Sequence, residues 1–129
     1  MAHASIMPPM LRLRRSAQSA SNAMAADWAV VYTESSVMAY IFAGAMYDLT
    51  TMALLDTIDV RVRKVIVSGG AWVVHDQTQY NDAQPVGHLA VNIGPIADVF
   101  GVEISMRQTA GTLRTIPCEF FDAMRLGLE

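Results

Sequence analysis

The stretch "PIADVFGVEISMRQTAGTLRTIPCEF", residues 95–120, contains the strongest local signals in the chain and decides the fold expected for it. Pro95 suits the first position of a helix, where the missing amide of proline costs nothing. Arg107 would lie near the negative end of that helix's dipole, and Gly111 would stop the helix. We therefore predict a helix from Pro95 to about Arg107, followed by a strand over 112–121.

A Phe-Gly pair lies at the centre of this expected helix. Gly101 there costs about 1 kcal/mol relative to alanine, so we expect it to let a strand approach closely. Phe100 would lie on the buried stripe. In the strand that follows, Ile116, Cys118 and Phe120 are expected on one inward face. The residues given structural roles are Pro95, Phe100, Gly101 and Gly111.

Upstream, residues 58–63 alternate between apolar and charged side chains, which predicts a half-buried strand. After Lys64 the alternation is lost over 65–67, which predicts either a bulge or fuller burial before the turn at 69–70. The basic cluster Arg61, Arg63 and Lys64 fits either a solvated strand face or a phosphate site. Further strands are expected over residues 27–33, 71–76 and 88–93.

The segment 37–47 is apolar on every side, which indicates a buried or a membrane helix. A spanning helix needs about 20 apolar residues, and this run is much shorter. We therefore expect a buried helix and no membrane partner.

Together these elements predict an α+β fold. It would be a ferredoxin-like sandwich of the βαββαβ type, preceded by one buried apolar helix. The first crossover helix would be reduced or missing, because residues 68–70 are too few for a crossover. We expect a disordered or transit-peptide-like tail over 1–26, a strand and apolar helix over 27–53, and the ferredoxin-like domain over 54–129.

Three segments in order resemble the C-terminal part of translation elongation factor G and elongation factor 2. The stretch 95–120 resembles the last domain, domain V, through its Phe-Gly pair, its Met-Arg pair and its closing Glu-Phe. Residues 34–46, "ESSVMAYIFAGAM", are similar to the helix that ends domain IV. Residues 54–62, "LLDTIDVRV", are similar to the segment that enters domain V.

This resemblance implies a non-catalytic, ribosome-associated module related to translocation. The chain has no phosphate-binding loop of the Gly-x4-Gly-Lys-Ser/Thr type, so it would not bind GTP by itself. Its partner would be rRNA or a ribosomal protein. The contact candidates are Arg107, Gln108, Thr109 and Arg114.

Composition supports a second hypothesis, a small homo-oligomeric assembly protein that buries the segment 37–47. Hydrophobic residues make up 53% of the chain and charged residues only 16%. A third hypothesis, an enzyme, would use His75, Asp76 or Cys118. Neighbouring strand residues point to opposite faces, however, so His75 and Asp76 are a poor pair. We expect no enzyme activity, cofactor or metal.

Charge and cysteine content bear on location. Residues 27–129 hold all 12 acids against 6 basic groups, which argues against broad contact with a phosphate backbone. One cysteine favours a reducing, cytoplasmic compartment. Residues 1–26 are rich in Ser, Ala and Arg and contain no acid, which also fits a mitochondrial transit peptide.

Overall fold

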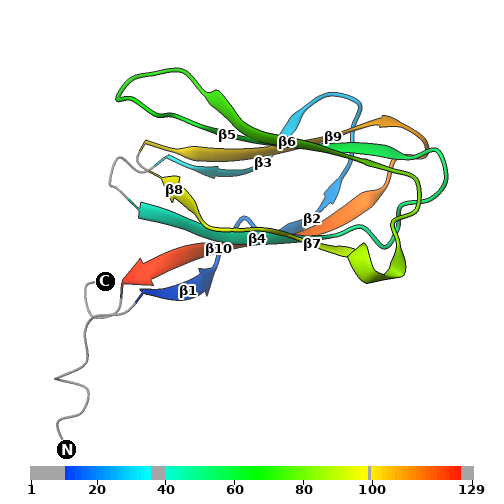
Figure 1. Ribbon diagram of the computed structural model, residues 1–129, viewed down its shortest axis with the longest axis horizontal. Coiled ribbons are helices and arrows are strands. Elements are labelled where there is room, and N and C mark those ends of the chain that lie inside the picture. Colours follow the sequence, from blue (N-terminus) through cyan, green and yellow to red (C-terminus); the bar gives the residue numbers. More distant parts are fainter. Residues whose placement is uncertain (1–10, 36–39, 99, 126–129) are drawn as a thin grey trace, which may run out of the picture.

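The computed structural model describes residues 11–35, 40–98 and 100–125. Regular structure in these residues consists of strands and one 3-10 turn, η1 (Val86–His88). Two sheets lie face to face as the two layers of a sandwich (Figure 1). The strands are β1 (Leu11–Arg15), β2 (Ala20–Ala23), β3 (Ala29–Glu34), β4 (Tyr40–Asp48), β5 (Thr57–Lys64), β6 (Val73–Asn81), β7 (Ala90–Ile93), β8 (Ile96–Asp98), β9 (Val102–Ala110) and β10 (Thr115–Arg125).

The order of the strands identifies the architecture. One sheet has the order β1-β10-β4-β7, with β2 also pairing with β10 and β8 also pairing with β4. The other sheet has the order β3-β9-β5-β6, and every pairing is antiparallel. If β1 with β2 and β7 with β8 each count as one interrupted strand, each sheet has four strands. The chain passes repeatedly from one sheet to the other, which is the arrangement of a jelly roll.

The core lies between the sheets. The ring of Tyr32 on β3 packs 5.1 Å from the ring of Phe42 on β4 and 4.9 Å from that of Phe120 on β10. The Tyr32 hydroxyl donates a hydrogen bond of 2.6 Å to Asp122. Ile116, Cys118 and Phe120 are all buried, so the predicted inward face of the last strand is confirmed. These aromatic contacts join the two sheets into one core.

The predicted helix over 95–107 is wrong. Residues 96–98 form β8 and residues 102–107 belong to β9, and Gly101 between them has a φ of +138°, which no helix contains; residue 99 lies outside the described residues. Along β9 the buried Val102, Ile104 and Met106 face the core, and the residues between them face outward. The period of two along β9 therefore prevails over the helix-start signal of Pro95, because pairing with β3 and β5 satisfies its backbone on both sides.

The predicted apolar helix over 37–47 is also wrong, because residues 40–47 belong to β4; residues 36–39 lie outside the described residues. Phe42, Ala45 and Tyr47 face the core. Gly44, with a φ of +146°, lies where β4 and β10 shift register. A β-carbon there would lie 2.9 Å from the carbonyl oxygen of Ile93, so this position requires glycine.

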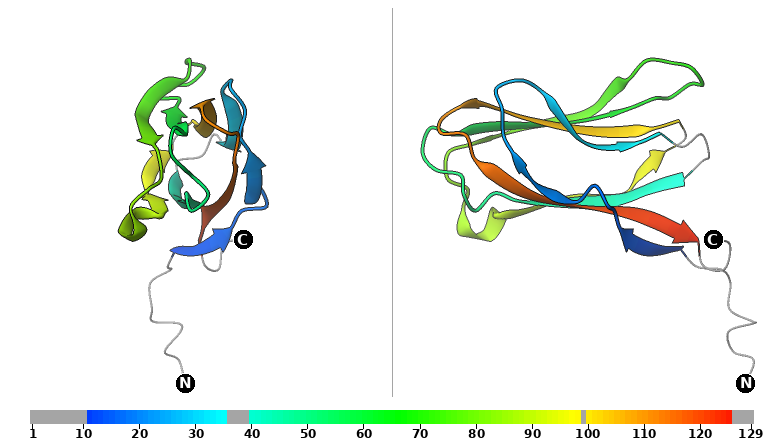
Figure 2. Two further views of the ribbon diagram at one scale, coloured as in Figure 1. Left: turned by 90° about the vertical axis from the view of Figure 1, so that its right-hand side faces the viewer. Right: turned by 180° about the vertical axis from the view of Figure 1, so that it is seen from behind.

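The fold is therefore all-β, and the predicted α+β ferredoxin-like class is wrong. Residues 11–15 and 20–23, which the composition assigned to a tail, supply β1 and β2 beside β10 (Figure 2). The predicted alternating strand over 58–63 is confirmed within β5, whereas residues 65–67, where a bulge or fuller burial was expected, lie outside the strand. Among the described residues, no helix has the length and apolarity needed to cross a lipid bilayer.

Candidate functional site

The outer face of the β3-β9-β5-β6 sheet is charged and carries two tryptophans. We call it the Trp–Arg face. The strand register places its charged side chains on the side of β5 and β9 that faces away from the core. Its principal members are Asp59, Arg61 and Arg63 of β5, Glu103 and Arg107 of β9, and the flanking Trp28 and Trp72.

The charges of the Trp–Arg face are largely paired with one another. Arg107 Nε donates to Asp59 Oδ2 at 2.8 Å, and the Arg63 guanidinium donates to Glu103. Asp59 and Glu103 are only 2% and 6% exposed although they point away from the core. The sheet's outer acids are therefore neutralised and covered within the chain itself.

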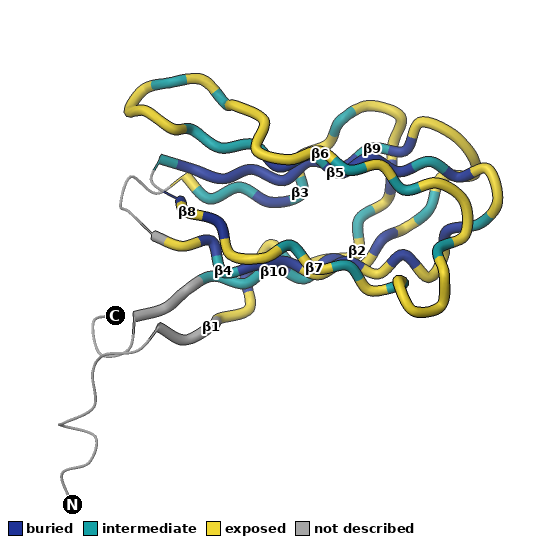
Figure 3. The backbone as a smooth tube through the Cα atoms, viewed as in Figure 1, coloured by how far each residue is buried: buried dark blue, intermediate teal, exposed yellow. Residues whose placement is uncertain are grey.

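Tryptophan supplies part of this cover. The guanidinium carbons of Arg61 and Arg107 each lie 4.3 Å from the centre of the Trp28 ring. Burial lowers the pKa of Arg61, and the charge of Arg63 acts in the same direction. Because of this outer layer, β9 is buried along nearly all its length (Figure 3).

The outer face of the other sheet is mostly apolar, and we call it the apolar face. Ile41 and Met46 of β4 point outward and are 45% and 42% exposed. Register places Ala97 beside Ile41, whereas Met46 lies directly between Glu119 of β10 and Asn92 of β7. Further small or apolar residues of this face are Ala43, Pro117 and Phe121. One ion pair crosses the face, with Arg15 Nε 2.6 Å from Glu119 Oε2.

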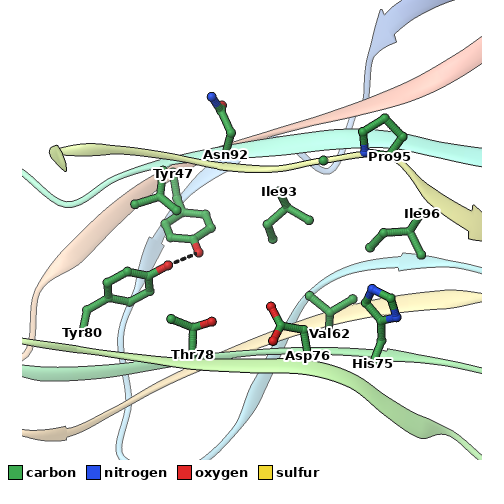
Figure 4. A pocket seen from close by; sticks show the side chains of 12 residues that line it. Tyr47, Val62, His75, Asp76, Thr78, Tyr80, Asn92, Ile93, Pro95 and Ile96 are labelled. Carbon is green, nitrogen blue, oxygen red and sulfur yellow. Dashed lines mark hydrogen bonds between the residues drawn. The ribbon is translucent and has the colours of Figure 1, made fainter. Parts of the chain in front are cut away.

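A pocket of about 300 Å³ opens between the two sheets, along the edge formed by β6 on one side and β7 with β8 on the other. The wall from β6 is polar, and Ile93 of β7 and Ile96 of β8 face it (Figure 4). Val91 of β7 also lines the pocket. The Tyr47 hydroxyl lies 2.9 Å from the Tyr80 hydroxyl at one end of the pocket. The side chains on the β6 wall are those of His75, Asp76, Thr78 and Tyr80.

A β-bulge explains why two consecutive residues line this pocket. The register between β5 and β6 shifts at Val62 and Arg63: Val62 faces Asp76, Arg63 faces Val74, and His75 is the extra residue. A bulge can re-aim a side chain in this way. The sequence argument that His75 and Asp76 must point to opposite faces is therefore wrong, since both line the pocket (Figure 4).

The four ribosome-contact candidates do not form one surface group. Arg107 pairs with Asp59 on the Trp–Arg face. Arg114 Nε donates to Asp56 at 2.7 Å, and Gln108 is 1% exposed and donates to the carbonyl oxygens of 110 and 112. Thr109 is exposed. The structure thus uses three of these side chains to connect its own strands and loops.

Of the residues given structural roles, Gly111 has the clearest one. With a φ of +84°, its β-carbon would lie 2.0 Å from Asp56 Oδ1. Asp56 is 1% exposed and accepts hydrogen bonds from the amides of Ala53 and Thr112. Gly111 therefore makes room for the buried carboxylate that connects the β4–β5 and β9–β10 loops.

The other structural candidates lie near the opposite end. A β-carbon on Gly101 would lie 3.0 Å from the Glu34 carbonyl oxygen and 3.1 Å from the Trp72 ring, so this position is crowded, although Gly101 does not lie in the helix that was expected to pack there. Pro95 borders the inter-sheet pocket, and its ring points away from it (Figure 4). Phe100 is half-buried in the turn between β8 and β9.

Cys118 lies in the core away from the His75–Asp76 pair. Its sulfur is 3.7 Å from the sulfur of Met106, and burial raises the pKa of the thiol to about 11. A thiol in this environment is a weak nucleophile. In the described part of the chain, no group of three or more His, Cys, Asp or Glu residues is arranged to hold a metal ion.

Sequence reasoning missed the two tryptophans. Trp28 precedes β3 and Trp72 precedes β6, so each comes just before a strand at the outer edge of the same sheet. The alternating arginines of β5 were a signal for a paired outer layer, but the position of Arg107 beside them depends on β9 being a strand.

Comparison with known proteins gives no family for this chain. No protein-family model matches it, and no curated protein or solved structure is significantly similar to it.

Proposed function

We propose that this protein is a non-catalytic structural module that assembles with further copies of itself through the apolar face. The observation that carries the proposal is the outer side of β4, where Ile41 and Met46 remain almost half exposed in a chain of low charge content.

The sequence pattern of β4 supports this proposal. A strand with one solvated face alternates apolar and polar side chains, whereas residues 40–47 are apolar throughout. The inward half of this strand enters the core, and the outward half has no covering layer within the described residues. A sheet face of this kind is typical of a surface that a partner covers.

The size and charge of the face suit a second copy. Four strands about 4.8 Å apart, at about 3.4 Å per residue over the nine residues of β4, give a face of roughly 600 Å² in plan. This is close to the roughly 800 Å² of accessible surface that each partner contributes to a standard interface. The Arg15–Glu119 pair is neutral overall, so two such faces can meet with limited charge repulsion.

Ribosome association, which the resemblance to elongation factors implies, stays a prediction. Its strongest cationic candidates, Arg107 and Arg114, each pair with a buried carboxylate of the chain, Asp59 and Asp56. Co-sedimentation with ribosomes at moderate salt tests this alternative separately.

Light scattering over a dilution series tests the proposed assembly. We expect the mass of the purified full chain to exceed that of a 14.1 kDa monomer at high protein concentration and to fall on dilution. A monomer mass at every concentration up to several hundred micromolar would overturn the proposal.

A further inference from the structure

The inter-sheet pocket combines one free carboxylate with an apolar wall. Asp76 is exposed at the pocket surface, and none of the hydrogen bonds or ion pairs among the described residues involves its carboxylate. Apart from Asp76 and the imidazole of His75, the lining consists of neutral side chains. Asp76 is therefore the one acidic side chain among the residues that line the pocket.

The wall opposite Asp76 offers hydrocarbon contacts. Ile93 and Ile96 point into the pocket from β7 and β8, and Val62 lies beside Asp76 on the β5 side (Figure 4). At one end, the Tyr47 and Tyr80 rings meet edge to face with their centres 6.0 Å apart. Burial raises the pKa of the Tyr47 hydroxyl, which therefore stays protonated and able to donate.

From this arrangement we infer that the inter-sheet pocket binds a small organic amine. Its ammonium group lies at the Asp76 carboxylate, and its hydrocarbon body lies against Ile93, Ile96 and Val62. The ammonium group of an amine is attracted to the unpaired Asp76 carboxylate, whereas a carboxylate ligand would be repelled by it. A neutral alcohol could form hydrogen bonds in the pocket, but it would lack this electrostatic attraction. Tyrosine rings beside the pocket also favour a cation over a neutral group.

The volume limits the size of the ligand. About 300 Å³ corresponds to roughly ten water-sized groups, which fits a single ring bearing an aminomethyl group. Benzylamine is therefore a suitable probe, and benzyl alcohol is its matched neutral control, because the two differ only in the ammonium and hydroxyl groups. For a ligand of this size in an open pocket, we expect a dissociation constant on the order of 1 mM.

Two-dimensional NMR titration of the full chain tests the inference. Benzylamine should shift the amide signals of residues 74–80, 91–94 and 96, and benzyl alcohol should bind about tenfold more weakly because it lacks the charge. Asp76→Asn should weaken benzylamine binding about tenfold and leave benzyl alcohol binding unchanged. Asp27→Asn is the matched control, because it removes the same charge just before β3, at the edge of the β3-β9-β5-β6 sheet opposite to β6. It should change the affinity for neither probe.

Several results would overturn the inference. The inference fails if the two probes bind equally well or if Asp76→Asn binds benzylamine as tightly as the natural chain. It also fails if the shifts are confined to residues outside the pocket, or if no shifts occur up to about 20 mM benzylamine. The unperturbed spectrum of Asp76→Asn serves as the check that the variant folds. The pocket lies between the sheets and not on the apolar face, so these results are independent of the oligomeric state.

Discussion

The outer faces of the two sheets differ in how far their side chains are shielded from water. On the Trp–Arg face, outward carboxylates such as Asp59 are paired with arginine, and Trp28 covers two guanidinium groups. On the apolar face, Ile41 and Met46 remain exposed and one solvated ion pair crosses the strands. The centre of the first face is covered by its own side chains, although Val30 and Val74 on its edge strands are 54% and 52% exposed, whereas the central strand β4 of the second lacks such cover within the described residues.

This difference indicates where a partner would gain most. Covering the Trp–Arg face would require desolvation of arginines that are already paired and stacked, which is costly. Covering the apolar face would remove hydrocarbon from water, at about 25 cal/mol per Å². The contrast therefore favours the β1-β10-β4-β7 sheet as the assembly surface.

The largest expected difference is in the free energy of unfolding that is lost when one ion pair is broken on each face. Asp59→Ala should lower the free energy of unfolding by about 2 to 3 kcal/mol, because it leaves Arg107 unpaired beside a nearly buried site. Glu119→Ala breaks the exposed pair with Arg15 and should leave that free energy almost unchanged. Urea denaturation measures both, and equal losses would remove the energetic distinction between the faces.

The next prediction concerns the pH dependence of stability that arises from Asp98, on the inner side of β8. Asp98 is 1% exposed, and burial, with a smaller contribution from Glu34, raises the pKa of its carboxyl to about 6 from an ordinary 3.8. The folded chain then binds more protons than the unfolded chain between about pH 4 and 6. The contribution of Asp98 to stability is therefore full below pH 4, falls by about 2 to 3 kcal/mol between pH 4 and 6, and stays constant above pH 6.

Asp98→Asn tests this sign directly. The variant keeps an oxygen that can accept from the Gly101 amide, which lies 3.0 Å from Asp98 Oδ1. It should be more stable than the natural chain at pH 7 and should lose this part of the pH dependence. If the two proteins show the same urea midpoints from pH 4 to 7, the buried charge of Asp98 does not lower the stability of the fold.

A smaller effect is expected for the cover of the Trp–Arg face. Trp28→Ala should reduce the free energy of unfolding by about 1 to 2 kcal/mol, because two cation–π contacts are lost. A double-mutant cycle with Arg61→Met should show a coupling of about 0.5 to 1 kcal/mol. Strictly additive losses would mean that Trp28 acts through its other contacts, and Trp28→Phe should recover part of the stability.

The smallest effect is expected on the apolar face of the isolated monomer. Met46→Glu places a carboxylate on an exposed position directly opposite Glu119 and should lower the free energy of unfolding of a dilute sample by less than about 1 kcal/mol. Thermal denaturation at low micromolar concentration measures it. A large loss there would show that Met46 stabilises the fold of a single chain.

Much of the strand content could be predicted from the sequence, but the fold could not. The alternation in β5 and the inward face of Ile116, Cys118 and Phe120 depend on side chains within one strand, and both are confirmed. The stretch 95–107 has capping residues suited to a helix, and only its pairing with β4, β3 and β5 makes it two strands. Local signals do not contain such long-range pairings.

The candidate sites show the same limit. The bulge at His75 follows from a register shift between β5 and β6, and that shift turns a poor residue pair into two pocket-lining residues. The exposed side of β4 could be recognised only once residues 40–47 formed a strand, since all-round apolarity also fits a buried helix. The excess of apolar residues was visible in the composition, and its location was not.

Sedimentation equilibrium of two matched variants tests the assembly face most directly. Met46→Glu introduces a charge on the apolar face, and Val30→Glu introduces the same charge at a 54% exposed valine on the outer side of β3, beside the Trp–Arg face. We predict that Met46→Glu weakens self-association at least tenfold and that Val30→Glu leaves it unchanged. Equal association of both variants with the natural chain, or a loss caused by Val30→Glu alone, would contradict the account.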